Sequence, residues 1–149
     1  MMISIVKIEN LPIDELLQLL EESKRMGFRF IERLIAEWES GDNRFDKDGE
    51  ALFIARDDKK VVGICGINID PYLGDPQVGR IRHLYVIVDE RRKGVGRELV
   101  QRVIEKARRH FLYLRLRASN EDFYRFYSAL GFASVYGDKN CTHILDLKE

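Results

Sequence analysis

Residues 84–96 read Leu-Tyr-Val-Ile-Val-Asp-Glu-Arg-Arg-Lys-Gly-Val-Gly, and this stretch decides how the chain folds. It begins as a strand-like apolar run, turns through charged residues and then enters a long amphipathic helix through two glycines. Backbone N–H groups converge at the start of such a helix, where the helix dipole is positive. Glycine at positions 94 and 96 lets a ligand approach the backbone closely. The stretch therefore predicts a binding site for a phosphate group.

Two common phosphate-binding motifs do not fit this turn. A P-loop requires a Lys-Ser/Thr pair after its last glycine, whereas Lys93 precedes Gly94 and Arg97 follows Gly96. A dinucleotide-binding fingerprint requires a third glycine, and Leu99 stands in its place. Two interpretations of the hexapeptide remain open: an acyl-CoA loop of the form R/Q-x-x-G-x-G/A, or an ordinary charged turn with a glycine at a helix start.

The length and composition indicate one domain, residues 1–149, with room for a sizeable core. Cys65 and Cys141 lie in apolar strand-like runs and are expected to be buried, reduced thiols. No Cys/His cluster has metal-ligand spacing, so no metal is expected. The chain has no recognisable signal peptide and no apolar run of membrane-spanning length, so we expect a cytoplasmic protein with no membrane partner.

Charge is segregated along the chain although the formal net charge is zero. Residues 1–50 hold 7 Lys/Arg and 12 Asp/Glu, whereas residues 80–117 hold 12 Lys/Arg and 4 Asp/Glu. The basic block brackets the predicted phosphate turn, as an anionic ligand requires, and the acidic N-terminal third suits a cationic acceptor. A nucleic-acid partner is not expected, because the aromatic stacking pattern of RNA-binding modules and helix-turn-helix spacing are both missing.

Hydrophobic periodicity predicts an α/β (α+β) fold with the element order β-α-α-β-β-β-α-β-α-β-β. The central strand is apolar on both faces, so helices are expected to cover both sides of the sheet. The predicted strands are 2–8, 51–56, 61–69, 80–88, 111–117, 132–136 and 140–147, and the predicted helices are 11–26, 28–39, 94–110 and 119–130.

The segment from Asn120 to Phe132, N-E-D-F-Y-R-F-Y-S-A-L-G-F, supplies a second motif. In it an asparagine opens a helix that carries Phe-Tyr and ends in Gly-Phe. This segment and the R-x-x-G-x-G turn after an L-x-V strand end, Leu84 to Val86, resemble the two signatures of the GNAT superfamily of N-acetyltransferases. The element order resembles that of the family over nearly the whole chain. The resemblance implies a mixed central sheet of about seven strands flanked by four helices.

The resemblance also implies acetyl-CoA, or coenzyme A, as co-substrate. Val86 and Val88 would pair through backbone groups with the pantetheine arm, and Asn120 would contact it with Phe123 packed nearby. Backbone N–H groups of the turn would hold the pyrophosphate, while the basic side chains would add charge for the remaining phosphate. The predicted cofactor-binding residues are Val86, Val88, Arg91, Arg92, Lys93, Gly94, Val95, Gly96, Arg97, Asn120 and Phe123.

Tyr127 is the predicted catalytic residue, from its match to the second motif. An amine attacks the thioester carbonyl, and the departing thiolate then needs a proton that a tyrosine hydroxyl can give. The Val86 N–H can polarise the carbonyl oxygen in the manner of an oxyanion hole.

The general base is not assigned by the resemblance. Several family members place a Glu or His on the central strand where this chain has Arg80 and Arg82, neither of which accepts a proton at neutral pH. The two arginines would suit an acceptor that bears a carboxylate or phosphate, in conflict with a cationic acceptor. The candidates for the base are His83, His143, and an ordered water backed by an acid such as Glu37 or Asp70.

We therefore expect an N-acetyltransferase that transfers an acetyl group from acetyl-CoA to a primary amine of a small molecule or peptide, by direct attack in a ternary complex. The alternative is a non-catalytic or regulatory acyl-CoA-binding module, which the missing strand acid keeps open. Either would act as a monomer or a homodimer.

Overall fold

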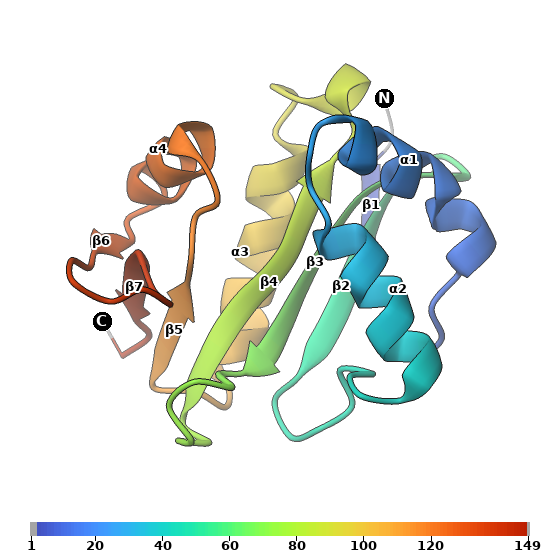
Figure 1. Ribbon diagram of the computed structural model, residues 1–149. Helices are drawn as coiled ribbons and strands as arrows, with labels where there is room; N and C mark the ends of the chain where they lie inside the picture. Colours follow the sequence, from blue (N-terminus) through green and yellow to red (C-terminus); the bar gives the residue numbers. More distant parts are fainter. Residues whose placement is uncertain (1–2, 149) are drawn as a thin grey trace.

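The computed structural model describes residues 3–148, which form a seven-stranded mixed sheet with helices on both faces (Figure 1). Three residues of the predicted domain lie outside the described residues: Met1, Met2 and Glu149. Met2 was predicted to begin the first strand. The order of elements agrees with the prediction. The strands are β1 (Ile3–Lys7), β2 (Ala51–Asp57), β3 (Lys60–Ile69), β4 (Val78–Val86), β5 (Tyr113–Leu116), β6 (Ala133–Ser134) and β7 (His143–Asp146).

Helices α1 (Leu17–Arg25) and α2 (Phe30–Ser40) pack on one face of the sheet, and α3 (Val95–Arg108) packs on the other (Figure 1). α1 is preceded by a 3-10 turn, η1 (Ile13–Leu16), so the first predicted helix is divided. The apolar stripe of α3 is buried against β2 and β3, and each large side chain in it stabilises the fold by about 1.5–3 kcal/mol. Its buried residues are Val95, Leu99, Val100, Val103 and Ala107.

The strands lie in the order β1-β2-β3-β4-β5-β7-β6, and every neighbouring pair is antiparallel except β4 and β5. That parallel pair is short. Its register runs only from Val78↔Tyr113 to Arg80↔Arg115, after which the two strands separate. Within residues 3–148, β4 continues to Val86 with no strand partner on this side, and β5 ends at Leu116. The chain then leads to α4 (Glu121–Ala129), which lies across the gap from β4.

β4 departs from the regular alternation that the sequence predicts. Its register against β3 shifts between Gly66↔Arg82 and Ile64↔Tyr85, so that His83 and Leu84 together oppose one residue. This is a β-bulge, and His83 adopts a left-handed conformation in it, with φ of 64°. The bulge twists the strand just before the end that was predicted to face a ligand.

The central strand is also shorter at its carboxyl end than predicted. It ends at Val86, and Val88 begins a single 3-10 turn, η2 (Val88–Glu90). The prediction that Val88 extends the strand is therefore wrong. Cys65 and Cys141 are buried and free, as predicted. No helix among residues 3–148 is both long and apolar enough to cross a membrane.

Candidate active site

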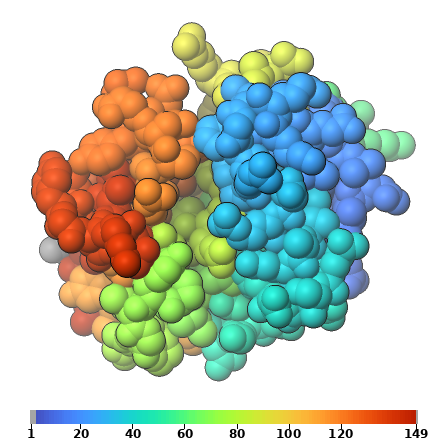
Figure 2. Space-filling view, in the orientation of Figure 1, coloured from blue at the N-terminus to red at the C-terminus, as the bar shows by residue number. Residues whose placement is uncertain are grey.

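A cavity of about 670 Å³ opens where β4 separates from β5. In Figure 2 a hollow divides the orange α4 region from the blue and cyan α1 and α2, with β4 at its floor. Nine of the eleven predicted cofactor-binding residues line the cavity, and Val88 and Lys93 do not. The lining residues are Met26, Phe28, Leu84, Val86, Arg91, Arg92, Gly94, Val95, Gly96, Arg97, Asn120, Asp122, Phe123 and Phe126.

The strand-to-helix turn has the backbone geometry that its glycines imply. Gly94 is the N-cap of α3 and has a left-handed φ of 85°, a conformation that costs other residues about 1–2 kcal/mol. Gly96 follows in the first turn of α3. A Cβ built on Gly96 would lie 3.6 Å from both Phe126 and Val86, at the wall of the cavity. The first turn of a fourteen-residue helix thus presents its N–H groups and its dipole to this space.

The basic residues of the turn differ in how they are held. Arg91 donates from Nε to the Val86 carbonyl at 2.8 Å, and its guanidinium lies 5.2 Å from the centre of the Tyr85 ring. Lys93 pairs with Glu90 at 3.2 Å and stands outside the cavity. Arg92 and Arg97 line the cavity and form no ion pair within residues 3–148, so their charges are available to an anion.

The amide of Val88 is already used by the protein. Its N–H donates to Oε2 of Glu22 at 3.1 Å, and Tyr85 Oη donates to the same oxygen at 2.5 Å. Glu22 therefore ties α1 to the end of β4, and the Val88 N–H is not free to pair with a pantetheine arm. Burial, followed by this carboxylate, raises the pKa of Tyr85. The sequence carried no signal for Glu22, because its partners Tyr85 and Val88 follow it in the chain by 63 and 66 positions.

The Val86 amide, in contrast, points into the gap. The Ile87 N–H donates to the Val62 carbonyl of β3 at 3.0 Å. Because N–H groups alternate in direction along an antiparallel strand, the Val86 N–H faces the side that β5 has left. The Val86 carbonyl on that side already accepts from Arg91, whereas the amide is left for a ligand.

A second cavity, of about 470 Å³, adjoins the first and shares Phe28, Leu84 and Phe123 with it. Its lining includes five arginines and, among the described residues, no aspartate or glutamate. The remaining lining includes Tyr72 from the loop before β4, His83 from the bulge and Tyr127 from α4. The arginines are Arg29, Arg33, Arg80, Arg82 and Arg117.

Tyr127 lies in α4, whose first turn is capped by Asn120, with Oδ1 of that residue accepting from the Phe123 N–H at 2.9 Å. The Tyr127 side chain is buried, and its ring packs edge-on against Phe126 and Phe132. Its hydroxyl forms no hydrogen bond with the described residues. Burial raises the pKa of Tyr127 well above its ordinary value, so the hydroxyl keeps its proton at neutral pH.

His83 lines the second cavity and is buried, with 6% of its surface exposed. Neither ring nitrogen has a hydrogen bond of normal geometry within residues 3–148. Burial, and then the charge of Arg82, lower the pKa of His83 to about 3, although a weaker backbone contact with Phe30 acts in the other direction. His83 is therefore an uncharged imidazole and a weak base.

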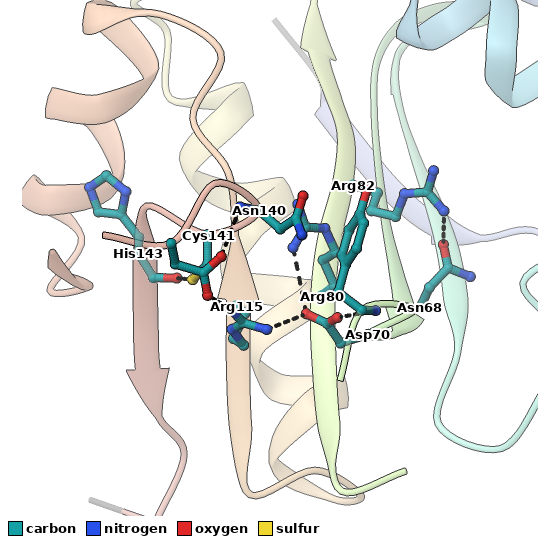
Figure 3. Close-up of polar contacts among 10 residues, drawn as sticks. Asn68, Asp70, Arg80, Arg82, Arg115, Asn140, Cys141 and His143 are labelled. Carbon is teal, nitrogen blue, oxygen red and sulfur yellow. Dashed lines mark hydrogen bonds and ion pairs between the residues drawn. The ribbon is translucent and has the colours of Figure 1, made fainter. Parts of the chain in front are cut away.

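The other candidates for the base are absent from the lining of both cavities. His143 is fully buried, and its ring nitrogens are bonded to Ser128 Oγ at 3.0 Å and Thr142 Oγ1 at 2.7 Å. Its ring lies 6.1 Å from the ring of Tyr127, so the suggestion that His143 acts as the base stays a prediction, although both of its nitrogens are already bonded within the protein. Asp70 lies between two buried arginines (Figure 3), and Glu37 faces Arg82 at 3.9 Å.

Comparison with known proteins agrees with this architecture. A sequence model of the acetyltransferase (GNAT) family matches residues 13–132. A crystal structure of a proposed acetyltransferase from Exiguobacterium sp. 255-15 is 31% identical, with a TM-score of 0.88 over 99% of this chain and 95% of that chain.

Two more distant structures share the fold. A GNAT acetyltransferase from Staphylococcus aureus Mu50 is 16% identical, with a TM-score of 0.73 and coverage of 98% and 99%. Glucosamine-6-phosphate N-acetyltransferase from Arabidopsis thaliana is 15% identical, with a TM-score of 0.66 and coverage of 94% and 97%.

Proposed function

Because the chain belongs to the acetyltransferase (GNAT) family, we propose that it transfers the acetyl group of acetyl-CoA to the primary amine of a small molecule or peptide. One observation carries the proposal. The cavity beside the glycine turn adjoins the cavity lined by Tyr127, and the two meet near the Val86 end of β4. The first would take the anionic cofactor and the second the acceptor, so the thioester would lie where they meet.

The charge and the glycine turn of the first cavity support coenzyme A as its ligand. The space beside Gly96 is large enough for a Cβ, and because glycine has none, a group of the ligand could occupy that space. The unpaired guanidinium groups of Arg92 and Arg97 would neutralise phosphate charge, and the N-terminus of α3 would accept the pyrophosphate.

In the proposed reaction the amine attacks the thioester carbonyl directly. The Val86 N–H donates to the carbonyl oxygen as negative charge develops there. A carbon–nitrogen bond forms, the carbon–sulfur bond breaks, and the thiolate of coenzyme A takes the proton of Tyr127 Oη. The attacking nitrogen gives up a proton to water as the amide forms, and solvent returns a proton to Tyr127.

The amine must reach the carbonyl without its proton. Among the described residues no carboxylate lines the acceptor cavity, and His83 is a weak base. The five arginines, however, create a positive potential that disfavours a nearby ammonium and lowers the pKa of a bound amine. We infer that the acceptor gives its proton to water, so that a dedicated base is not required.

Two measurements test this function. Acetyl-CoA should raise the melting temperature, and a thiol-release assay across an amine panel should detect turnover. No stabilisation by acetyl-CoA at millimolar concentration would refute both catalysis and cofactor binding. Stabilisation without turnover of any amine would favour the alternative, a non-catalytic acyl-CoA-binding module.

A further inference from the structure

We propose that the acceptor is an anionic amine, a small molecule that carries a carboxylate or phosphate group beside its primary amine. The inference rests on the acetyl-transfer function proposed above and specifies its substrate class. It starts from the second cavity, which five guanidinium groups line without a carboxylate among the described residues. A volume of about 470 Å³ suits a small molecule.

The protein neutralises only part of the positive charge of this cavity. Arg33 and Arg117 are exposed and form no ion pair or side-chain hydrogen bond within residues 3–148. Arg29 and Arg82 each face a carboxylate at 3.9 Å, from Glu32 and Glu37, which is beyond the length of a good hydrogen bond. Four of the five guanidinium groups therefore keep N–H donors for another partner.

Arg80 has a different role. It is buried, lies 3.5 Å from Asp70 Oδ2, and stacks over the Tyr72 ring at 4.7 Å. Its charge is shared with a buried carboxylate, so we assign it to the wall of the cavity and not to the ligand. The anion would be held by the residues nearer the opening, with Arg33 on α2 and Arg117 after β5 on opposite sides of the cavity.

His83 gives an independent indication of a polar ligand. Its imidazole is buried in the lining of the same cavity, and neither ring nitrogen has a hydrogen bond of normal geometry within the described chain. Buried polar atoms normally have a partner, and a neutral imidazole offers one donor to an anionic oxygen. Guanidinium donors and an imidazole donor around a cavity without carboxylates favour an anion and disfavour a polyamine.

The acidic N-terminal third does not contradict this assignment. Its helix α2 presents Arg33 to the cavity, while Glu32 and Glu37 of the same helix are absent from the lining. These two carboxylates pair with Arg29 and Arg82 from outside the lining, so the side chains that face the cavity itself carry positive charge.

The test compares amines that differ only in the attached group. Propylamine, 3-aminopropanoate and 1,3-diaminopropane form one matched series, and ethanolamine with O-phosphoethanolamine forms a second. At saturating acetyl-CoA we expect kcat/KM for the anionic member to exceed that of its neutral and cationic counterparts by about tenfold or more. The two series distinguish a carboxylate from a phosphate. Preference for the neutral or cationic amine in both series would overturn the inference.

Arginine variants then connect the preference to the cavity. Arg33→Gln and Arg117→Gln should each raise KM for the preferred anionic amine about tenfold, the loss of one charge-assisted contact, and leave KM for acetyl-CoA unchanged. The matched control is Arg109→Gln, an exposed arginine outside both cavities, which should behave as the wild type. Unchanged KM in both cavity variants would refute the assignment.

Calorimetric titration separates this inference from the proposed function. 3-Aminopropanoate and O-phosphoethanolamine are titrated into the protein saturated with coenzyme A. Binding that Arg33→Gln and Arg117→Gln weaken, without thiol release in the assay, would support the ligand class and refute acetyl transfer. Thiol release from neutral amines with no binding of either anionic amine would refute the ligand class alone. If neither anionic amine binds and no amine is turned over, the proposed ligand class is refuted as well.

Discussion

Arg80 and Arg115 face each other at the last paired position of β4 and β5, and both guanidinium groups donate to the same oxygen of Asp70. The separations from Asp70 Oδ2 are 3.5 Å and 3.3 Å, and Arg115 also reaches Asp138 at 2.6 Å. Figure 3 shows the carboxylate between the two arginines. Two buried like charges thus stand where the sheet opens, and the Asp70 side chain between them has no exposed surface.

Replacing Asp70 should strongly destabilise the protein. Asp70→Asn leaves two buried guanidinium groups with one remaining carboxylate, and breaking a buried ion pair in this way costs about 3–5 kcal/mol. Urea denaturation measures the loss. The control is Asp75→Asn in the same loop, where the carboxylate caps an exposed turn through the Gln77 N–H, and the expected change there is below about 1 kcal/mol. Equal effects of the two variants would show that Asp70 does not neutralise the arginines.

The order of elements and the glycine turn could be predicted because they depend on local sequence. The apolar stripe of α3 has the period of a helix. Asn120 caps α4 through the Phe123 N–H, only three residues away. The left-handed φ of Gly94 is a property of that residue and its immediate neighbours. These are short-range properties, and they predicted a binding site at the carboxyl end of the central strand, where the structure has a cavity.

What the sequence could not predict depends on long-range contacts. Nothing near His83 marks a bulge, since its left-handed φ is imposed by the register of β3 against β4. Glu22 resembles any acidic residue on a solvated helix, although it binds both Tyr85 and Val88. The charge of the proposed acceptor cavity was ambiguous for the same reason: Arg33, Arg82 and Arg117 come from separate elements and meet only in the folded chain.

Acid should destabilise the protein through His83. Its pKa is about 3 in the folded state against 6.5 when unperturbed, so between these values the unfolded state binds the proton. The free energy of unfolding should therefore fall as the pH drops from 6.5 toward 3, by up to about 1.4 kcal/mol per pH unit from this residue.

Comparison with His83→Asn isolates that contribution, because asparagine tolerates a left-handed φ and does not titrate. Urea denaturation of both proteins at pH 7, 5.5 and 4.5 gives the difference in free energy of unfolding. The wild type should lose stability relative to the variant at each step down in pH. A difference that does not change with pH would mean that His83 is not held neutral.

Tyr127→Phe should lower kcat by about 100-fold or more, because the thiolate then leaves without its proton donor. The melting temperature should not fall, since the hydroxyl forms no hydrogen bond with the described residues. Tyr124→Phe is the matched control: Tyr124 lies in the same helix, and its hydroxyl donates to Ser134 at 2.7 Å on the surface. If both variants retain wild-type kcat, the proton donor is not Tyr127.

The dependence of rate on pH follows from the shifted pKa values of His83 and Tyr127. His83 stays uncharged at every pH well above 3, and Tyr127 keeps its proton to above pH 10. Between pH 6 and 9, kcat/KM should therefore rise about tenfold per unit as more of the free amine loses its proton, with no falling limb. A bell-shaped profile with an inflection near pH 6.5 would instead reveal a base on the enzyme.

Alanine substitutions at Gly94 and Gly96 should have different effects, one on stability and the other on cofactor binding. Gly94→Ala forces a side chain into a left-handed conformation and should cost about 1–2 kcal/mol in the free energy of unfolding, although a Cβ there meets nothing within 4 Å.

Gly96→Ala should leave stability unchanged or raise it by up to about 1 kcal/mol, because the position is helical and a Cβ lies at ordinary contact distance from Phe126 and Val86. That Cβ would occupy the wall where the cofactor is proposed to approach the backbone, so KM for acetyl-CoA should rise at least about tenfold. Urea denaturation and thiol-release kinetics on both variants separate the two effects. A Gly96→Ala protein with wild-type KM for acetyl-CoA would place the pyrophosphate away from this turn, since a bound phosphate and a methyl group cannot share the same space.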